Sequence, residues 1–280
     1  MPSFIMLVQQ LLEDVQGWYN DSMGKADPRA VDLPLAQTPG PILSILLLYI
    51  LIVIHGPRMM EQHKPLQIRW LLIGYNFSMV ALSFWIFAKT LTAAIRGRFS
   101  LICQPVDYTD KPDAVEALYT GWLFFFSKIL ELADTIFFIL RKKNSQVSFL
   151  HVYHHTTIVV VTWSGMKFVS GGQSFVYPLL NSLVHVVMYL YYGLSAIGPS
   201  MQKYLWWKRY LTIFQLTQFI LMLTHAAVNY FVECDFPKLF DKLLFMYAGS
   251  IMALFLNFYF RAYIQGKRPV PSVSKTHKDK

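Results

Sequence analysis

Three histidines lie close together near the middle of the chain, in the segment His151-Val-Tyr-His154-His155. Positions i, i+3 and i+4 fall on one face of a helix, so the three imidazole rings share a stripe. Imidazole can ligate a metal, attack an electrophile or move protons near neutral pH. The neighbouring sequence is largely apolar, and polar groups in such a setting pair or face a cavity. The spacing therefore predicts a functional site on this helix.

The rest of the chain has the composition of an integral membrane protein. Of 280 residues, 55% are hydrophobic and 15% are charged, where a soluble chain carries about a quarter charged residues. Apolar runs near the roughly 20 residues that cross a bilayer predict seven helices: Pro39–Ile54, Trp70–Leu91, Val115–Leu140, Phe149–Val169, Phe175–Ile197, Trp206–Val232 and Leu239–Tyr263. The first run is short and histidines interrupt the fourth, so six or eight spans are also open. Met1–Gln16 lacks the basic start of a cleavable signal peptide.

The charges predict the orientation of these spans. With the N-terminus outside, the inner side receives 15 of the 25 Lys and Arg residues and only two acidic residues, Glu61 and Asp279. The positive-inside rule then places the C-terminal tail in the cytosol. Asn20-Asp21-Ser22 forms a glycosylation sequon on the lumenal side. Cys103 and Cys234, the two cysteines of the sequence, also fall in lumenal loops, where a disulfide between them is expected.

Three more predicted spans carry polar stripes. The third has Lys128, Glu131, Asp134 and Thr135, the fifth has Asn181, His185, Met188, Tyr189 and Tyr192 with Tyr191 beside them, and the sixth has Thr212, Gln215 and Gln218 with His225 further on. Lys128 can pair with Glu131 across one turn, which leaves Asp134 to orient a histidine on a neighbouring helix. Glu131, Gln218 and His225 can also be helix-packing groups. Together the stripes predict a shared polar cavity inside the bundle.

Two kinds of chemistry fit such a histidine cluster. A di-iron site of the histidine-box desaturase kind needs more histidines than the five that this chain places in its bundle: His151, His154, His155, His185 and His225. A zinc site needs only three or four ligands and stays open. The other interpretation is an imidazole that acts as a nucleophile, with the remaining polar groups as its acid–base partners.

Four motifs resemble, in order and spacing, the signature boxes of the very-long-chain fatty-acid elongases. They are Lys128-x-x-Glu131-x-x-Asp134-Thr135, His151-x-x-His154-His155, His185-x-x-Met188-Tyr189-x-Tyr191-Tyr192 and Thr212-x-x-Gln215-x-x-Gln218, and the similarity extends from Gly56 to Tyr263. The flanks Arg141–Gln146 and Lys203–Lys208 are similar to the animal branch that handles saturated and monounsaturated chains. The resemblance implies an all-α integral membrane protein with seven transmembrane helices, six of them forming a barrel around a narrow acyl tunnel open to the cytosol. The expected organisation is a lumenal segment 1–38, a catalytic domain 39–263 and a basic cytosolic tail 264–280.

The same resemblance implies a reaction. A long-chain acyl-CoA and malonyl-CoA would condense to 3-oxoacyl-CoA, CO₂ and CoA, with no cofactor and no metal. Helix spacing does not distinguish the three clustered histidines, but the family's nucleophile is the middle one, here His154, which would form an acyl-imidazole. His185 would stabilise the enolate or oxyanion, His151 and Asp134 would set tautomer and orientation, and His155 belongs to the same catalytic group. The expected substrate-binding residues are Lys128, Arg141, Lys143, Gln146, His151, Asn181, His185, Tyr191, Lys208, Thr212 and Gln215.

Two other classes stay open at this point. A histidine-ligated membrane metalloenzyme would contain stoichiometric metal, and a seven-helix receptor or transporter would release no CO₂ from malonyl-CoA. The expected partners are the two CoA substrates, membrane lipid and the other enzymes of the elongation cycle, and a homodimer is left open. The net charge of +9 fits anionic lipid or substrate, and nothing indicates nucleic acid. The resemblance places the protein in the endoplasmic reticulum membrane, although Lys275–Lys280 departs from a dilysine retention signal.

Overall fold

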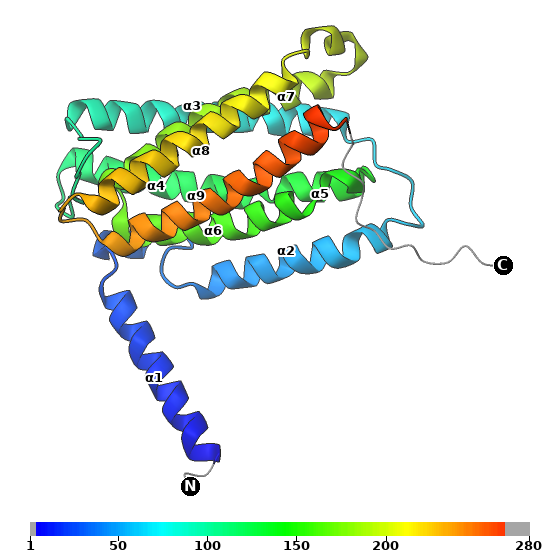
Figure 1. Ribbon diagram of the computed structural model, residues 1–280. Helices are drawn as coiled ribbons and strands as arrows, with labels where there is room; N and C mark the ends of the chain where they lie inside the picture. The colour runs from blue at the N-terminus through cyan, green and yellow to red at the C-terminus, as the bar shows by residue number, and fades with distance from the viewer. Residues whose placement is uncertain (1–3, 267–280) are drawn as a thin grey trace.

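The computed structural model describes residues 4–266, and all the regular secondary structure of this part is helical. The α-helices are α1 (Phe4–Gly24), α2 (Gly40–Met59), α3 (Arg69–Arg96), α4 (Pro112–Glu131), α5 (Ala133–Leu140), α6 (Phe149–Val169), α7 (Val176–Ile197), α8 (Lys208–Phe231) and α9 (Lys238–Tyr259). A π-helical turn, Phe260–Ile264, continues α9, and short 3₁₀ turns join several helices. The predicted all-α class is confirmed (Figure 1).

Five helical segments within residues 4–266 are long and apolar enough to cross a membrane. They are α2, α3, Gln173–Ile197, α8 and Lys238–Ile264, and they make the chain a multi-pass membrane protein. The two other predicted spans, Val115–Leu140 and Phe149–Val169, do not meet the same measure of length and hydropathy. The first of these is divided into α4 and α5, and the second, α6, carries three histidines. The prediction of seven spans therefore stays a prediction.

The division between α4 and α5 occurs at Leu132. The Leu132 N–H donates to Ile129 O at 3.2 Å, an i→i+3 bond that tightens the turn. Glu131 ends α4 and Asp134 lies in the first turn of α5. Leu132 between them has φ −60° and ψ −24°, so the chain passes from α4 to α5 without leaving the helical region.

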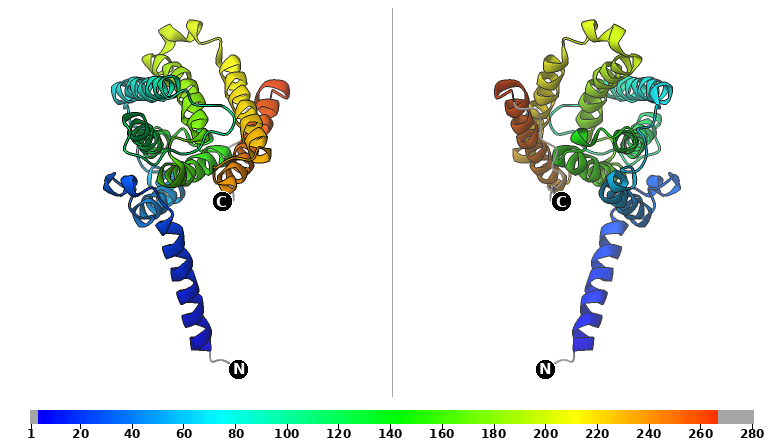
Figure 2. Two further views of the ribbon diagram at one scale, coloured as in Figure 1. Left: turned by 90° about the vertical axis from the view of Figure 1, so that its left-hand side faces the viewer. Right: turned by 90° about the vertical axis from the view of Figure 1, so that its right-hand side faces the viewer.

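Six helices contact one another in a closed order: α3 with α4, α4 with α6, α6 with α9, α9 with α8, α8 with α7, and α7 with α3. The views along the bundle in Figure 2 show the same six helices arranged around a common centre. Helix α2 lies outside this group and packs against α5 and α6. This arrangement directs one face of each of the six helices toward the interior, where their polar side chains can meet.

The end of the bundle at which α2 begins, here called the disulfide end, is held together by covalent and hydrogen bonds. The predicted disulfide between Cys103 and Cys234 is present, and it joins the α3–α4 connection to the α8–α9 connection with the Cα atoms 5.2 Å apart. Trp122 and Trp163 donate through Nε1 to the backbone carbonyls of Pro34-Leu35, at 2.9 and 3.0 Å. The chain between α1 and α2 is thereby fixed to α4 and α6.

The opposite end, here called the histidine end, is where α6 begins. Helix α7 also ends there, at Gly198, whose φ of +114° lies in the region that favours glycine. The guanidinium of Arg69 lies 3.3 Å from the position that a Cβ on this residue would take, and it donates to the carbonyl of Ile197. A side chain at position 198 would therefore strain the backbone and displace the contact between α3 and α7.

Candidate active site

The first turn of α6 sets the position of the histidine stripe. Ser148 is the N-cap of α6, and its hydroxyl accepts the backbone N–H of His151 at 3.3 Å. The ring centroids of His151 and His155 are 4.2 Å apart, and those of His154 and His155 are 5.3 Å apart. The predicted clustering of the three imidazoles on one helix is confirmed.

The three imidazoles nevertheless have different surroundings. His151 Nε2 lies 2.7 Å from Thr135 Oγ1, and His155 is buried with its Nδ1 unpartnered. His154 lines a cavity inside the bundle, and its ring nitrogens have no hydrogen-bond partner among residues 4–266. Of the three, His154 is thus the imidazole that lines the cavity.

A chain of hydroxyl groups leads from α2 to His151. Tyr49, on the outer helix α2, places its OH 3.0 Å from Thr135 Oγ1, which in turn contacts His151 Nε2. If the Thr135 hydroxyl accepts from Tyr49, it can donate its own proton to Nε2, which leaves the imidazole proton on Nδ1. We call Tyr49, Thr135 and His151 the hydroxyl relay. Thr135 was expected within the motif, but the contribution of α2 was not.

A buried ionic cluster, here called the lysine network, joins α4 to α7. Lys128 Nζ donates to Glu131 Oε1 at 2.7 Å and to Asn181 Oδ1 at 2.8 Å, so the predicted Lys128–Glu131 pair is confirmed. His185 Nδ1 lies 3.0 Å from the same Glu131 oxygen. Lys128 and Glu131 are 2% and 1% exposed. Such charges are tolerated in a bundle interior because each has a partner.

The two contacts of Nδ1 decide how His185 can act. Besides Glu131, Nδ1 lies 3.5 Å from Lys128 Nζ, an ammonium group that can only donate a hydrogen bond. When Nδ1 accepts from Lys128, the proton of the neutral imidazole is on Nε2, which can then donate to another group. A hydrogen bond at one ring nitrogen fixes the tautomer and the orientation of an imidazole.

The contacts of Asp134 differ from those expected. Asp134 Oδ2 accepts from the Tyr189 hydroxyl at 2.8 Å, and the carboxylate that contacts a histidine is Glu131. The prediction that Asp134 orients a histidine is wrong at the level of direct contact. The physical reason is the packing of α5 against α7, which places the Tyr189 hydroxyl beside the Asp134 carboxylate.

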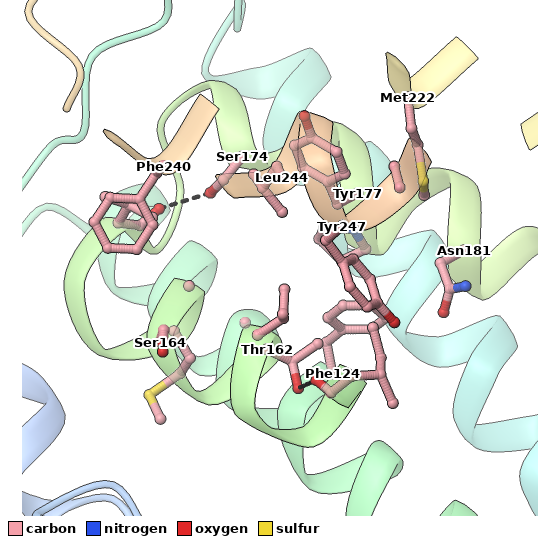
Figure 3. Close-up of a pocket in the computed structure, with 18 of the residues that line it drawn as sticks. Phe124, Thr162, Ser164, Ser174, Tyr177, Asn181, Met222, Phe240, Leu244 and Tyr247 are labelled. Carbon is pink, nitrogen blue, oxygen red and sulfur yellow. Dashed lines mark hydrogen bonds between the residues drawn. The ribbon is translucent and has the colours of Figure 1, made fainter. Parts of the chain in front are cut away.

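The cavity has a volume of about 650 Å³ and lies among α4, α6, α7, α8 and α9. Its wall follows α6 from His154 to Val169, which at 1.5 Å per residue is roughly 22 Å. In Figure 3, Thr162, Leu244 and Tyr247 project into one space from opposite walls. The far part of the wall contains the rings of Phe99, Phe175 and Phe240, so the cavity is long and ends among aromatic side chains.

The cavity is mostly apolar, which corrects the prediction of a shared polar cavity. Of the residues expected at the site, His154 and Asn181 line it, whereas Lys128 and His185 are not part of its wall. The polar stripes of α4 and α7 instead bond to one another in the lysine network. The network still borders the cavity, because Asn181 belongs to both and Lys128 Nζ lies 4.7 Å from the centroid of Phe124, a wall residue.

Three wall residues with unpartnered polar atoms were not expected at the site. Gln218 Oε1 and the hydroxyls of Tyr177 and Tyr247 are buried without a hydrogen-bond partner among the described residues. Gln218 lies three residues beyond Gln215 on α8, so its spacing could have placed it here, although helix packing was the preferred interpretation. The two tyrosines give no such signal, since tyrosine is common in membrane helices near both membrane–water interfaces.

The remaining residues expected to bind substrate lie around the histidine end. Tyr191 packs edge-to-face on Trp207, Thr212 Oγ1 is 3.4 Å from Tyr263 OH, and Gln215 Nε2 contacts Met188 Sδ at 3.6 Å. Lys143, Gln146 and Lys208 are exposed and Arg141 is half-buried. The structure thus brings this set to one end of the bundle, but it does not place it on the cavity wall.

Within residues 4–266, no three or more His, Cys, Asp or Glu side chains are grouped in a way that could hold a metal ion. The three clustered histidines of α6 point to different neighbours: Thr135, the cavity and the protein interior.

Comparisons with known proteins agree with the motifs. The family described as ELO: GNS1/SUR4 matches residues 34–270. Very long chain fatty acid elongase 4 of Homo sapiens is 48% identical over 267 residues, which cover 95% of this chain and 85% of the relative. Very long chain fatty acid elongase 1 of Homo sapiens is 44% identical over 260 residues, covering 92% and 93%. Very long chain fatty acid elongase 7 of Rattus norvegicus is 44% identical over 254 residues, covering 90% of each chain. The chain therefore belongs to the ELO (GNS1/SUR4) family of very long chain fatty acid elongases.

Proposed function

We propose that the protein is a condensing enzyme of fatty-acid elongation that joins a long-chain acyl-CoA to a two-carbon unit from malonyl-CoA. The observation that carries this proposal is His154, a free imidazole at one end of a long apolar cavity. The cavity has the shape and lining for an acyl chain, because burying each CH₂ group contributes about 0.8 kcal/mol. An imidazole beside the bound thioester is a suitable acyl acceptor. The names of the relatives agree with this substrate class.

The first half-reaction forms an acyl-enzyme. His154 attacks the thioester carbonyl, a nitrogen–carbon bond forms, the carbon–sulfur bond breaks, and CoA leaves as the thiol after taking a proton. In the second half-reaction malonyl-CoA loses CO₂, and the electron pair of the broken carbon–carbon bond becomes an enolate. The enolate carbon attacks the acyl carbon, a carbon–carbon bond forms, and the nitrogen–carbon bond to His154 breaks. His154 regains a proton from water as it leaves, which yields 3-oxoacyl-CoA. Covalent catalysis of this kind divides one difficult condensation into two easier steps.

The lysine network supports the second half-reaction. His185 Nδ1 lies 3.5 Å from Lys128 Nζ and would accept from it, so the proton of the imidazole would be on Nε2, which would donate a hydrogen bond to the enolate or the oxyanion. Lys128 compensates the charge of Glu131 and holds the amide of Asn181, which borders the cavity. The hydroxyl relay would orient His151, and His155 would complete the histidine group. Asp134 would act at a distance, through Tyr189. No metal or other cofactor takes part in this scheme.

The proposed CoA site is the histidine end of the bundle. Arg141, Lys143 and Lys208 would bind the phosphates of CoA through charge-assisted hydrogen bonds. Gln146, Tyr191, Thr212 and Gln215 would position the remainder of the molecule. Positive charge at this end is also what the positive-inside rule demands of a cytosolic face, so the same residues would serve topology and binding.

The proposed membrane arrangement follows from the closed order of six helices. These six would form a barrel around the acyl tunnel, with α2 as the seventh span outside it. The N-terminus would be lumenal and the C-terminal tail cytosolic, in the endoplasmic reticulum membrane, where the Asn20 sequon is accessible to glycosylation. The disulfide between Cys103 and Cys234 supports this orientation, since disulfides persist in oxidising compartments. The product needs reduction of its 3-oxo group, so the other enzymes of the elongation cycle are the expected partners.

Intact-mass measurement after incubation with acyl-CoA alone tests the mechanism. The protein should gain one acyl group, and His154→Ala should gain none. His225→Gln is a matched control, because it changes another histidine of the bundle, half-buried and packed edge-to-face on the ring of Tyr177, and it should still be acylated. Acylation that persists in His154→Ala, or an active protein with stoichiometric zinc or iron and no adduct, would refute the scheme.

A further inference from the structure

Helix α1 has a continuous apolar face that no other part of the described chain covers. The side chains on this face recur every three or four residues and are exposed: Phe4, Leu7, Val8, Leu11, Leu12, Val15 and Trp18. The large side chain of Trp18 is 70% exposed. Apolar residues at this spacing form one stripe of an amphipathic helix, and such a stripe needs an apolar partner.

The opposite face of α1 is polar and acidic. It carries Gln9, Gln10, Glu13, Gln16, Asn20 and Asp21. At 3.6 residues per turn, Leu11 and Glu13 project about 200° apart, nearly opposite each other. The sequence of α1 contains Glu13, Asp14 and Asp21 but no Lys or Arg. Anionic lipid head groups would therefore not attract this helix.

The placement of α1 indicates what covers its apolar face. Figures 1 and 2 show that α1 leaves the disulfide end of the bundle and runs across the direction of the other helices. Since those helices cross the membrane along their lengths, a helix transverse to them at one end lies along a membrane surface. The neighbouring part of α2 exposes Leu43 and Leu47 at the same end, so the apolar surface of α1 continues that of a span.

We propose that α1 is an in-plane helix that lies in the interface of the leaflet at the disulfide end, with its apolar face in neutral lipid and its acidic face in water. Apolar burial alone would hold it, in contrast to interfacial helices that rely on Lys and Arg for anionic lipid. Asn20 lies on the polar face, so it remains accessible from the aqueous side. This inference is independent of the reaction at His154.

Two labelled variants of the full-length protein test the orientation. Both cysteines of the sequence are in the disulfide, so a single introduced cysteine can be labelled specifically. Leu11→Cys and Glu13→Cys, each carrying an environment-sensitive fluorophore, form a pair on opposite faces of one turn. The protein is placed, one copy per disc, in phosphatidylcholine nanodiscs with and without brominated acyl chains, which quench only labels that reach the hydrocarbon.

Bromine should quench the label at position 11 at least about threefold more than the label at position 13. Replacing a third of the phosphatidylcholine by phosphatidylserine should leave this ratio unchanged, because α1 has no basic residue to respond. Equal quenching at both positions would overturn the proposal. So would a position-11 label that is shielded only when two copies share a disc, since that result assigns the face to a second copy of the chain. An increase in quenching with phosphatidylserine would contradict the selection of neutral lipid.

Discussion

Replacing Lys128 by methionine should strongly destabilise the protein, because it leaves Glu131 as a buried charge without its cation. Both side chains are almost fully buried, and Lys128 Nζ is 2.7 Å from Glu131 and 2.8 Å from Asn181. Removing one partner of a buried pair costs about 3–5 kcal/mol. At roughly 2 °C per kcal/mol for a chain of this size, the apparent melting temperature should fall by about 6–10 °C. Methionine is close to lysine in length, so the loss reports charge and not a cavity.

Thermal unfolding in detergent at a fixed scan rate measures this effect. The double variant Lys128→Met/Glu131→Gln should recover at least about half of the lost stability, because a neutral amide replaces the stranded carboxylate. The control is Lys25→Ala, which breaks an exposed Lys25–Asp21 pair of 2.7 Å and should cost at most about 1 kcal/mol. A melting temperature of Lys128→Met within about 2 °C of the parent, or a double variant no more stable than the single one, would refute the reasoning.

Elongation assays separate this structural role from a catalytic one. If the lysine network supports the enolate through His185, the double variant should regain stability without regaining malonyl-CoA-dependent CO₂ release. Recovery of both properties together would show that the network only holds α4 to α7.

Three further variants test other parts of the structure. Tyr49→Phe removes the outer donor of the hydroxyl relay and should lower the free energy of unfolding by about 1 kcal/mol. The pH profile of elongation should shift, because the tautomer of His151 is no longer fixed. An unchanged pH profile would contradict the relay. Phe240→Ala removes a ring from the far part of the cavity wall and so lengthens the cavity. For an acyl-CoA two carbons longer, kcat/KM should rise by about tenfold relative to the parent substrate, at about 0.8 kcal/mol per CH₂. Product analysis with a series of acyl-CoA lengths measures this, and an unaltered length profile would show that the Phe240 ring does not limit the acyl chain. Cys103→Ser removes the disulfide to Cys234 and should lower the free energy of unfolding by about 2–4 kcal/mol. Reduction of the parent protein should lower its free energy of unfolding by the same amount. A parent protein whose stability does not change with reductant would show that the disulfide does not contribute to stability.

The sequence predicted those features that depend on local periodicity. The i, i+3 and i+4 spacing correctly placed His151, His154 and His155 on one stripe, and the i+3 spacing correctly paired Lys128 with Glu131. Both follow from the geometry of a single helix turn, so no tertiary information was needed.

Other features depend on how the helices are rotated against each other. The choice of His154 as the imidazole that faces the cavity depends on the packing of α6 against its neighbours, which periodicity does not describe. The bonding of the Asp134 carboxylate to Tyr189 of α7, and not to a histidine, depends on the same kind of packing. Helix α1 is not among the predicted helices, because its amphipathic sequence is too polar for a membrane span.

The position of Tyr49 bears on the smallest unit that could work as a catalyst. Helix α2 lies outside the closed order of six helices, so a shortened protein that begins at α3 would retain every residue that lines the cavity. It would lose Tyr49, whose hydroxyl contacts Thr135, the residue that contacts His151. A truncated protein could therefore still enclose an acyl chain and yet work poorly as an acyltransferase. The outer helix is, on this view, part of the catalytic unit and more than a membrane anchor.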